Sequence, residues 1–378
     1  MGNLRKRQQV LQRLLDNMAA ITLEALAHSY LKKPKVDADY ALKKIDYEWQ
    51  DGGAYALLGP SGCGKTTLLN IISGLLLPSR GRVKFDGKDV TDLSPEERNI
   101  AQVFQFPVIY DTMSVADNLA FPLLNRGVAK NEVKERVAKM LDTLELTDKA
   151  KRRAHGLTAD EKQKISLGRG LVRYDVNAIL FDEPLTVIDP HMKWQLRTKL
   201  KELHEQFSHT MIYVTHDQTE ALTFADKVVV MYEGEVVQIG TPEELFDEPA
   251  HTFVGYFIGS PGMNILPGTV DGNTVSVAGK SLELAQAYPL MNGKVEVGIR
   301  PEFIKLARRD EASDAGMPMD IRVVENVGRH KIVRGTINGE AIDAVLDEGD
   351  SVPSEPYAVF DTSRVNVYED SHLVRAGA

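Results

Sequence analysis

The sequence predicts an α/β domain with a mostly parallel sheet, followed by a small all-β domain. A short apolar run, Ala54–Leu58, ends in a glycine-rich loop and leads into a helical stretch over 65–74. Two later apolar runs enclose a helical segment around 191–207, and such strand–helix–strand alternation is typical of parallel strands joined by crossover helices. Beyond residue 260 the chain consists of short alternating segments separated by Gly and Pro, which predicts the all-β domain.

The other expected elements follow in chain order. Residues 1–17 have the pattern of a short polar helix, which we interpret as a flexible N-terminal extension, with an interaction arm as the alternative. The pattern becomes strand-like from Ile21. Apolar residues at helical spacing between 131 and 155 predict a helix-rich insertion with a charged outer face. The remaining expected strands are 178–181, 211–214, the hairpin pair 227–231 and 235–239, and then 274–277, 294–299, 321–324 and 332–337. We therefore expect an extension at 1–17, a first domain at 18–259 with a helical subdomain at about 107–175, and a β domain at 260–378.

Composition excludes several classes of function. A formal net charge of −9 argues against nucleic acid as a partner, because phosphate binding needs concentrated Lys and Arg. The single cysteine, Cys63, excludes an intrachain disulfide framework and fits a reducing compartment. No apolar stretch approaches the roughly 18 residues of a membrane-spanning helix, and the basic N-terminus lacks both an apolar signal-peptide region and a myristoylation pattern. Any membrane association is therefore expected to come through a partner.

The glycine-rich loop after the first strand matches the phosphate-binding pattern G-x-x-x-x-G-K-[ST] at every position. Glycines let successive backbone N–H groups converge on a phosphate, and the helix that follows points its positive end at the anion. The lysine would reach the β- and γ-phosphates, and the threonine hydroxyl is a hard oxygen ligand for Mg²⁺. The loop consists of Gly59, Pro60, Ser61, Gly62, Cys63, Gly64, Lys65 and Thr66, with Thr67 next in the helix. We interpret Cys63 as a small loop-filling residue.

Polar residues also follow two later strands. The strand at 178–181 ends in Asp182 and Glu183, and the strand at 211–214 leads to His216. Because ligands bind at the carboxyl ends of parallel strands, these side chains are expected near the phosphate loop. Asp182 is the candidate holder of Mg²⁺, Glu183 the candidate general base that polarises a water, and His216 would reach the γ-phosphate. Taken alone, the two acids would instead be interpreted as a solvated loop.

At this point the chain resembles the ATPase subunits of ABC importers, in the maltose-type sugar branch with a C-terminal β domain. The resemblance covers about residues 20 to 370. It rests on the phosphate loop, Val103-Phe104-Gln105, the stretch Leu180–Pro190, Tyr213–Asp217 and Gly298-Ile299-Arg300-Pro301-Glu302. The amino-acid sequences of several segments resemble those of one of the two paired ATPase subunits of bacterial glycerol importers. The resemblance implies an α/β P-loop ATPase domain, the ABC cassette with its helical subdomain, and a small all-β, OB-like regulatory domain.

The resemblance also implies roles for individual residues. Gln105 matches the glutamine that senses Mg²⁺ and couples to the membrane subunits, and Asp189 matches an aspartate at the dimer interface. His216 matches the switch histidine. Tyr30 matches the aromatic residue that stacks on adenine, although an insertion at 32–39 leaves Tyr40 as the alternative.

One motif departs from the family. The family carries Leu-Ser-Gly-Gly-Gln before a helix, where it binds the γ-phosphate held by the opposite subunit; this chain has Leu157 followed by Thr158, Ala159, Asp160 and Glu161. Thr158 and Glu161 keep a capping-box pattern, so the helix is still expected to start there. Two like charges about 4 Å apart repel by roughly 4 kcal/mol at an effective dielectric constant of about 20. We therefore interpret this segment as a helix start without a phosphate-binding role.

These expectations combine into a transport ATPase that uses ATP and Mg²⁺ at the cytoplasmic face of the membrane, importing a sugar or small polyol, with glycerol the best single candidate. The implied partners are a second ATPase subunit in a heterodimer, two transmembrane permease subunits and a periplasmic or surface solute-binding protein. The altered signature keeps open a non-hydrolysing regulatory subunit of the same kind of transporter. A soluble ABC protein acting on ribosomes or DNA would carry two cassettes or a long coiled coil, and the sequence shows neither.

Overall fold

The computed structural model describes residues 19–312 and 314–377, so the helix expected at 1–17 lies outside the described residues. The chain divides into two compact units, and the division falls between Val236 and Val237. The boundary expected from the sequence, at 259/260, lies further along the chain. Within the described part of the chain, no helix is both long and apolar enough to span a bilayer.

The first unit contains most of a six-stranded sheet, whose last strand in the chain, β10, crosses the division. Its strands, in chain order, are β3 (Ala54–Leu58), β6 (Ile100–Val103), β7 (Ala178–Asp182), β8 (Met211–Thr215), β9 (Lys227–Tyr232) and β10 (Glu235–Gly240). They lie in the order β10-β9-β3-β8-β7-β6, and the pairs β9–β3, β3–β8, β8–β7 and β7–β6 are parallel. Every residue of β3 and β8 is buried, as expected for strands covered on both faces. The predicted α/β class with a mostly parallel sheet is confirmed.

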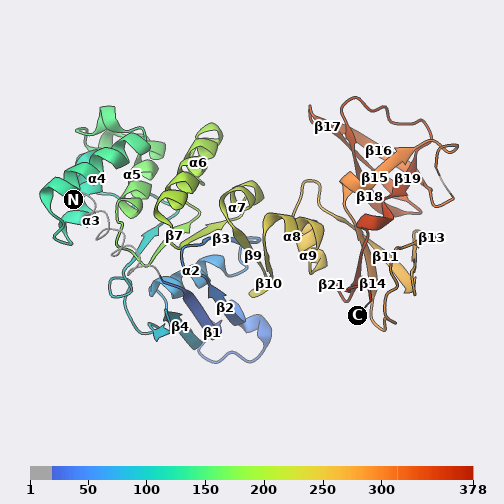
Figure 1. The fold of residues 1–378 in the computed structure, drawn as a ribbon, viewed down its shortest axis with the longest axis horizontal. Coiled ribbons are helices and arrows are strands. Elements are labelled where there is room, and N and C mark those ends of the chain that lie inside the picture. Colours follow the sequence, from blue (N-terminus) through green and yellow to red (C-terminus); the bar gives the residue numbers. More distant parts are fainter. Residues whose placement is uncertain (1–18, 313, 378) are drawn as a thin grey trace, which may run out of the picture. The chain divides into compact units, whose positions relative to one another are not determined.

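Helices connect these strands and form a separate helical subdomain. The connecting helices are α2 (Lys65–Ser73), α6 (Pro190–Phe207) and α7 (Gln218–Phe224); the subdomain contains α3 (Val115–Leu124), α4 (Lys130–Thr143) and α5 (Ala159–Leu171). The three subdomain helices pack together in Figure 1. Helix α4 buries Val133, Val137, Met140 and Leu141, the apolar stripe that its spacing predicts.

A second, antiparallel sheet completes the first unit. It consists of β1 (Ile21–His28), β2 (Leu42–Trp49), β4 (Arg80–Phe85) and β5 (Lys88–Asp89), in the order β2-β1-β4-β5. The sequence indicates only the start of this sheet, because β2 and β4 alternate poorly and carry many charged residues. The insertion at 32–39 forms the connection from β1 to β2 and contains a single 3-10 turn, Asp37–Asp39.

The second unit has two antiparallel sheets and two short helices, which confirms the predicted all-β character of this region. The helices are α8 (Pro242–Asp247) and α9 (Thr252–Phe257). One sheet has the order β13-β12-β11-β14-β20-β21, with β11 (Asn264–Asp271), β12 (Thr274–Val277), β13 (Lys280–Glu283), β14 (Val295–Ile299), β20 (Asn366–Glu369) and β21 (His372–Leu373). The other has the order β15-β19-β16-β17-β18, with β15 (Ile304–Ala307), β16 (Met317–Asn326), β17 (His330–Ile337), β18 (Glu340–Asp347) and β19 (Tyr357–Phe360).

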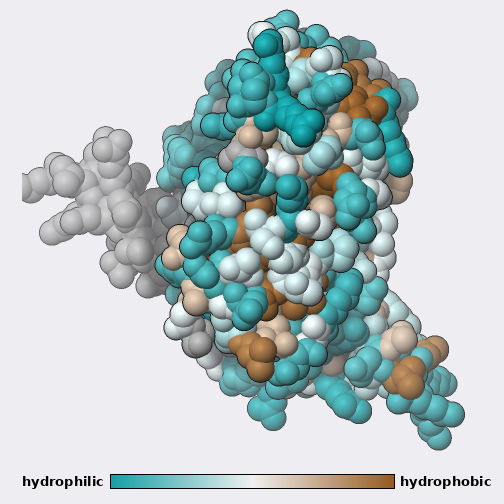
Figure 2. All heavy atoms as spheres, turned by 90° about the vertical axis from the view of Figure 1, so that its right-hand side faces the viewer, coloured by the Kyte–Doolittle hydropathy of each residue, from teal (hydrophilic) through white to brown (hydrophobic). Residues whose placement is uncertain are grey.

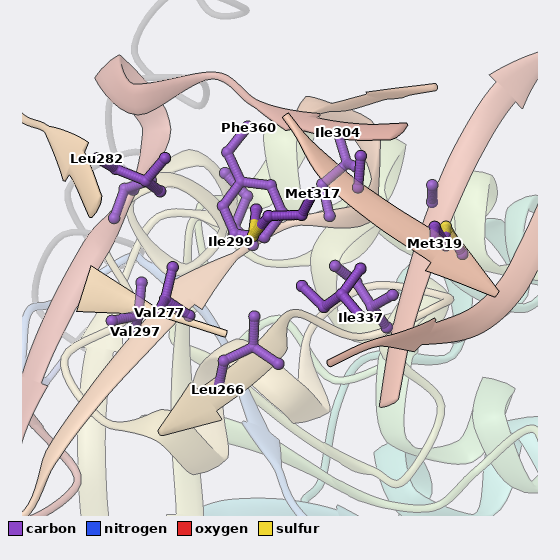
Figure 3. Packing of buried hydrophobic residues seen from close by; sticks show 14 of the residues in the cluster. Leu266, Val277, Leu282, Val297, Ile299, Ile304, Met317, Met319, Ile337 and Phe360 are labelled. Carbon is purple, nitrogen blue, oxygen red and sulfur yellow. The ribbon is translucent and has the colours of Figure 1, made fainter. Parts of the chain in front are cut away.

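A single apolar core joins these two sheets. Side chains from both meet in it, including Leu266 and Val297 from the first sheet and Met317, Ile337 and Phe360 from the second (Figure 3). The face of the molecule in Figure 2 is mostly hydrophilic, and its hydrophobic residues lie in small separate groups. The described part of this face therefore offers no broad apolar docking surface.

Candidate functional site

The phosphate loop connects β3 to α2, and its glycines are required by their surroundings. A Cβ on Gly59 would lie 2.2 Å from the main-chain oxygen of Met231, and one on Gly64 would lie 2.5 Å from that of Ala41. Gly62 and Gly64 have φ values of 84° and 101°, in the region that favours glycine. Gly64 is the N-cap of α2 and supplies no side chain to the free N–H groups of the first turn. The loop therefore presents unpaired N–H groups at a helix N-terminus, an arrangement that binds anions.

Lys65 and Cys63 lie inside the curl of this loop. The buried ammonium of Lys65 donates to the main-chain oxygens of Gly59 at 2.8 Å and Pro60 at 2.9 Å. Cys63 is also buried, and burial raises the pKa of its thiol. Pro60 is partly buried and Ser61 is exposed on the outer side of the loop.

Thr66 and Asp182 bring the phosphate loop and the end of β7 together. The hydroxyl of Thr66 donates to Oδ1 of Asp182 at 3.1 Å, and burial raises the pKa of this carboxyl. Among the described residues no three His, Cys, Asp or Glu side chains gather as a metal site. A hydroxyl and one carboxylate nevertheless suit Mg²⁺, which is commonly held by one or two protein oxygens together with substrate phosphates.

Glu183, at the end of β7, is the residue on which the other predicted side chains converge. Its Oε2 accepts hydrogen bonds from Gln105 Nε2 at 3.4 Å and from the Thr186 hydroxyl at 3.2 Å, and lies 3.1 Å from Nδ1 of His216. The described residues donate no hydrogen bond to Oε1, which is thus the oxygen open to a water. Glu183 also has a φ of 45°, an uncommon backbone conformation that concentrates at functional sites.

Tyr30 lies beside the phosphate loop. Its hydroxyl is 3.0 Å from that of Thr67 in the first turn of α2, and two-thirds of its surface is exposed. Tyr40, the alternative, lies against the guanidinium of Arg80, 5.8 Å from the ring centre, on the antiparallel sheet. The geometry therefore favours Tyr30 as the aromatic surface next to a bound nucleotide.

The segment Thr158–Glu161 forms the start of α5. Thr158 and Glu161 make both bonds of a capping box, and Glu161 is also ion-paired with Lys149. Its carboxylate is therefore turned back toward the preceding chain. Asp160 has a buried Oδ1 without a hydrogen-bond partner. Burial raises the pKa of its carboxyl, the charge of Lys164 opposes this shift in part, and Glu161 and Asp189 add smaller effects in the raising direction. Of the two acids expected to repel a phosphate here, only Asp160 remains uncompensated by an ion pair.

Asp189 serves as the N-cap of α6, where its side chain accepts a hydrogen bond of 2.9 Å from the main-chain N–H of His191. Ala159, at the first position of α5, is exposed.

Sequence reasoning missed two residues of the site. Thr186 bonds the carboxylate of Glu183, and its position three residues further along a turn was the only available signal. Gln163 lies fully buried on α5 and bonds the main chain on both sides of the site. A lone amide on the apolar face of a helix could have indicated it.

Two family models and several curated relatives match this chain. The family model described as ABC transporter matches residues 42–186, and the model described as MalK OB fold domain matches residues 259–304. The chain is 40% identical over 310 residues to the sn-glycerol-3-phosphate import ATP-binding protein UgpC of Vibrio vulnificus, a match that covers 82% of this chain and 82% of the relative. It is 40% identical over 333 residues to the protein of the same name from Yersinia pestis, covering 87% of this chain and 90% of the relative.

A solved structure also matches part of this chain. CbiO1 from Clostridium perfringens, described as part of the ABC transporter complex cbiONQ, matches with a TM-score of 0.54 and 29% identity. The match covers 60% of this chain and 90% of that chain.

Proposed function

The chain belongs to the ABC transporter family of ATP-binding proteins, and we propose that it powers import of a sugar or small polyol from the cytoplasmic face of the membrane. As a transport ATPase it couples hydrolysis of ATP to movement of a solute, which passes through other subunits. The proposed partners are two transmembrane permease subunits and a solute-binding protein outside the membrane. The observation that carries the proposal is the convergence of Gln105, Thr186 and His216 on the carboxylate of Glu183, next to an intact phosphate loop.

The proposed mechanism uses the N–H groups of the phosphate loop and the polar side chains around it. The β- and γ-phosphates of ATP bind the N–H groups at the start of α2, and Lys65 exchanges its bonds to Gly59 and Pro60 for phosphate oxygens. Oε1 of Glu183 accepts a proton from the attacking water, while Oε2 stays fixed by its donors. His216 is placed to contact the γ-phosphate. Thr66 and Asp182, with Gln105 near, would hold Mg²⁺, which neutralises charge on the phosphates.

Glycerol is the solute that we propose, on the similarity of several segments to paired ATPase subunits of glycerol importers. The curated relatives are named for import of sn-glycerol 3-phosphate, a phosphorylated form of the same polyol. Uptake of radiolabelled glycerol and of radiolabelled sn-glycerol 3-phosphate should be compared in cells with and without the gene for this chain. Loss of glycerol uptake alone supports the proposal, and loss of glycerol phosphate uptake alone assigns the relatives' solute instead.

We further propose that two ATP molecules are held between this chain and a second, different ATPase subunit. The support is the start of α5, where Asp160 stands at the place that in the family receives the phosphate of the opposite subunit. A partner with a Ser-Gly-Gly-type signature would complete the site built on Lys65. Mass spectrometry of the intact transporter, purified through a tag on this chain, tests the composition: one copy each of two ATPases supports the proposal, and two copies of this chain contradict it.

A non-hydrolysing regulatory subunit is the second candidate, favoured only by the altered signature. The two candidates differ in the effect of Lys65→Ala in reconstituted vesicles. If this chain hydrolyses ATP for transport, the variant stops uptake; if it only regulates, uptake continues at a changed rate.

A further inference from the structure

Gln163 lies two residues beyond the signature segment on α5, and its side chain contacts the catalytic loops. The residue is 0% exposed. Its Nε2 donates to the main-chain oxygen of Phe104 at 3.2 Å and to that of Pro184 at 2.7 Å. One buried amide group therefore connects three segments that are far apart in the sequence.

The two acceptors fix the orientation of this amide. Both are carbonyl oxygens, which only the NH₂ group can satisfy. The oxygen Oε1 is left buried without a hydrogen-bond partner. A buried amide that leaves its own acceptor unpaired is unfavourable, and the two donated hydrogen bonds offset this cost.

The two carbonyls flank the two residues of the proposed water site. Phe104 directly precedes Gln105, and Pro184 directly follows Glu183. Gln105 and Glu183 bond each other at 3.4 Å, a long contact that depends on the spacing of their main chains. Glu183 is also held at a φ of 45°, and such a conformation persists only where surrounding contacts enforce it.

We propose that Gln163 is a positioning residue that holds the main chains of Gln105 and Glu183 at the separation needed for water activation. Because Thr158 is the N-cap of α5, the same amide ties the signature segment to the catalytic loops of this chain. A displacement of α5 at its signature end would thus reach Glu183 through Gln163. The inference rests on the proposed roles of Glu183 and Gln105.

The test measures ATPase kinetics of the assembled transporter containing Gln163→Met, Gln163→Glu or Ile165→Val. Methionine matches the length of glutamine but cannot donate, so kcat should fall at least about 10-fold while the KM for ATP changes less than about 2-fold, because the phosphate loop is untouched. Ile165 is 0% exposed on the same helix, and its trimming serves as the control for lost packing. It should leave kcat within about 2-fold of wild type.

The glutamate variant adds a second measurement, the pH dependence of kcat, which a loss of packing alone would not change. A protonated carboxyl donates one hydrogen bond to a carbonyl oxygen, whereas a carboxylate repels it. The kcat of Gln163→Glu relative to wild type should therefore rise as the pH falls from 8 to 6, while the relative kcat of Gln163→Met stays constant. Thermal unfolding of each variant at both pH values shows whether the recovered kcat comes from the restored hydrogen bond or merely from a more stable fold.

Three outcomes overturn the inference: a Gln163→Met variant with wild-type kcat, an equal loss of kcat in Ile165→Val, or a pH response of Gln163→Glu matched by its unfolding temperature. If Gln163→Met does not fold, the glutamate variant alone decides between these results. Full turnover by Glu183→Gln would instead overturn the proposed function, so the two failures are distinguishable.

Discussion

Nδ1 of His216 lies 3.1 Å from Oε2 of Glu183, although 32 residues separate them in the sequence. The two residues follow the neighbouring parallel strands β7 and β8, whose carboxyl ends meet at one edge of the sheet. Gln105, which follows β6 on the other side of β7, reaches the same oxygen. The order of strands alone thus brings three chain segments to one carboxylate.

Replacement of Glu183 by Gln should abolish hydrolysis and preserve ATP binding. The amide keeps the size of the side chain but cannot take a proton, so we expect turnover to fall at least about 100-fold in the assembled transporter. Glu145→Gln is the matched control, because Glu145 also has a positive φ, 57°, but lies in an exposed turn of the helical subdomain. Near-normal turnover of Glu183→Gln would remove this residue from the catalytic role.

Cys63 should report occupancy of the phosphate loop. It is the only cysteine of the chain, is buried, and has a pKa raised by that burial, so a maleimide should label it slowly at neutral pH and faster as the pH rises. Labelled protein should lose ATP binding, and ATP added beforehand should protect the thiol. Complete labelling without any change in ATP affinity would place the thiol outside the phosphate site.

The sequence carries enough information for the parallel sheet because its strands are short apolar runs bounded by glycines or polar residues. Ala54–Leu58, 178–181 and 211–214 all became strands of that sheet. The antiparallel sheet was harder to recognise, since β2 reads Leu-Lys-Lys-Ile-Asp-Tyr-Glu-Trp and buries only Leu42, Ile45 and Trp49. These three buried residues do not alternate strictly, because the pairing between β2 and its partner β1 shifts register twice. No local sequence pattern predicts such irregularities.

The residues of the candidate site also fall into two groups, those that a local sequence pattern predicts and those that depend on tertiary contacts. The phosphate loop, Asp182, Glu183 and His216 have local patterns whose chemistry limits the residue types, so their neighbourhood could be predicted. Gln163 and Lys149 act through contacts with segments distant in sequence, Gln163 with Phe104 and Pro184, and Lys149 with Glu161. An ion pair or amide bond of this kind depends on tertiary structure, which a single sequence does not specify.

Arg98 should be essential for stability of the phosphate-loop helix. Its buried guanidinium donates to the main-chain oxygens of Ile71 and Ile72 in the last turn of α2, at 2.7 and 2.8 Å, and to those of Thr91 and Leu93. Arg98→Leu removes all of these hydrogen bonds, although the oxygen of Ile71 still accepts one from the N–H of Gly74 at 3.2 Å. The substitution should lower the free energy of unfolding by at least about 3 kcal/mol. Urea unfolding measures the change, and Arg152→Leu, at an exposed position, should have little effect.

His209 should make the protein less stable in mild acid. Burial lowers its pKa from 6.5 to about 4, with His204 contributing in the same direction. Between these values the unfolded chain binds a proton that the folded chain does not, so the free energy of unfolding falls as the pH drops below about 6.5. At pH 5 the loss from this group is about 2 kcal/mol, from 1.5 pH units at about 1.4 kcal/mol each.

A variant without a titrating ring isolates this effect. His209→Phe keeps an aromatic side chain beside Phe207, whose ring lies 6.1 Å away, and should lose less stability than wild type between pH 7.5 and pH 5. His155→Gln, at an exposed position, should lose as much as wild type. Equal losses in wild type and His209→Phe would show that His209 is protonated in the folded state.

The two ATP sites of the assembled transporter should be unequal. In the family each site combines the phosphate loop of one subunit with the signature of the other. This chain has a complete phosphate loop with Glu183 and His216, but its signature presents Asp160. A carboxylate about 4 Å from a phosphate oxygen would oppose closure by roughly 4 kcal/mol at an effective dielectric constant of about 20.

Of the two acids at the start of α5, only Asp160 is left to repel the phosphate. Glu161 is engaged by Lys149 and by its own capping box, whereas the buried Oδ1 of Asp160 has no hydrogen-bond partner. A homodimer would repeat the defect at both sites, so the purified chain alone should hydrolyse little ATP. In a heterodimer the site on Lys65 would be completed by the partner's signature and remain active, and the site completed by this chain would turn over slowly.

Two substitutions separate these sites in the assembled transporter. Lys65→Ala should stop transport, because it disables the active site, whereas Asp160→Ala should change transport little, because it alters a site that contributes little turnover. Solute uptake into vesicles and ATP hydrolysis, measured together, provide the comparison. A homodimer of this chain that hydrolyses ATP at two equivalent sites would contradict the asymmetric arrangement. It would require Asp160 to turn away from the phosphate on closure, leaving the Thr158 hydroxyl and the N–H groups of α5 to bind the anion.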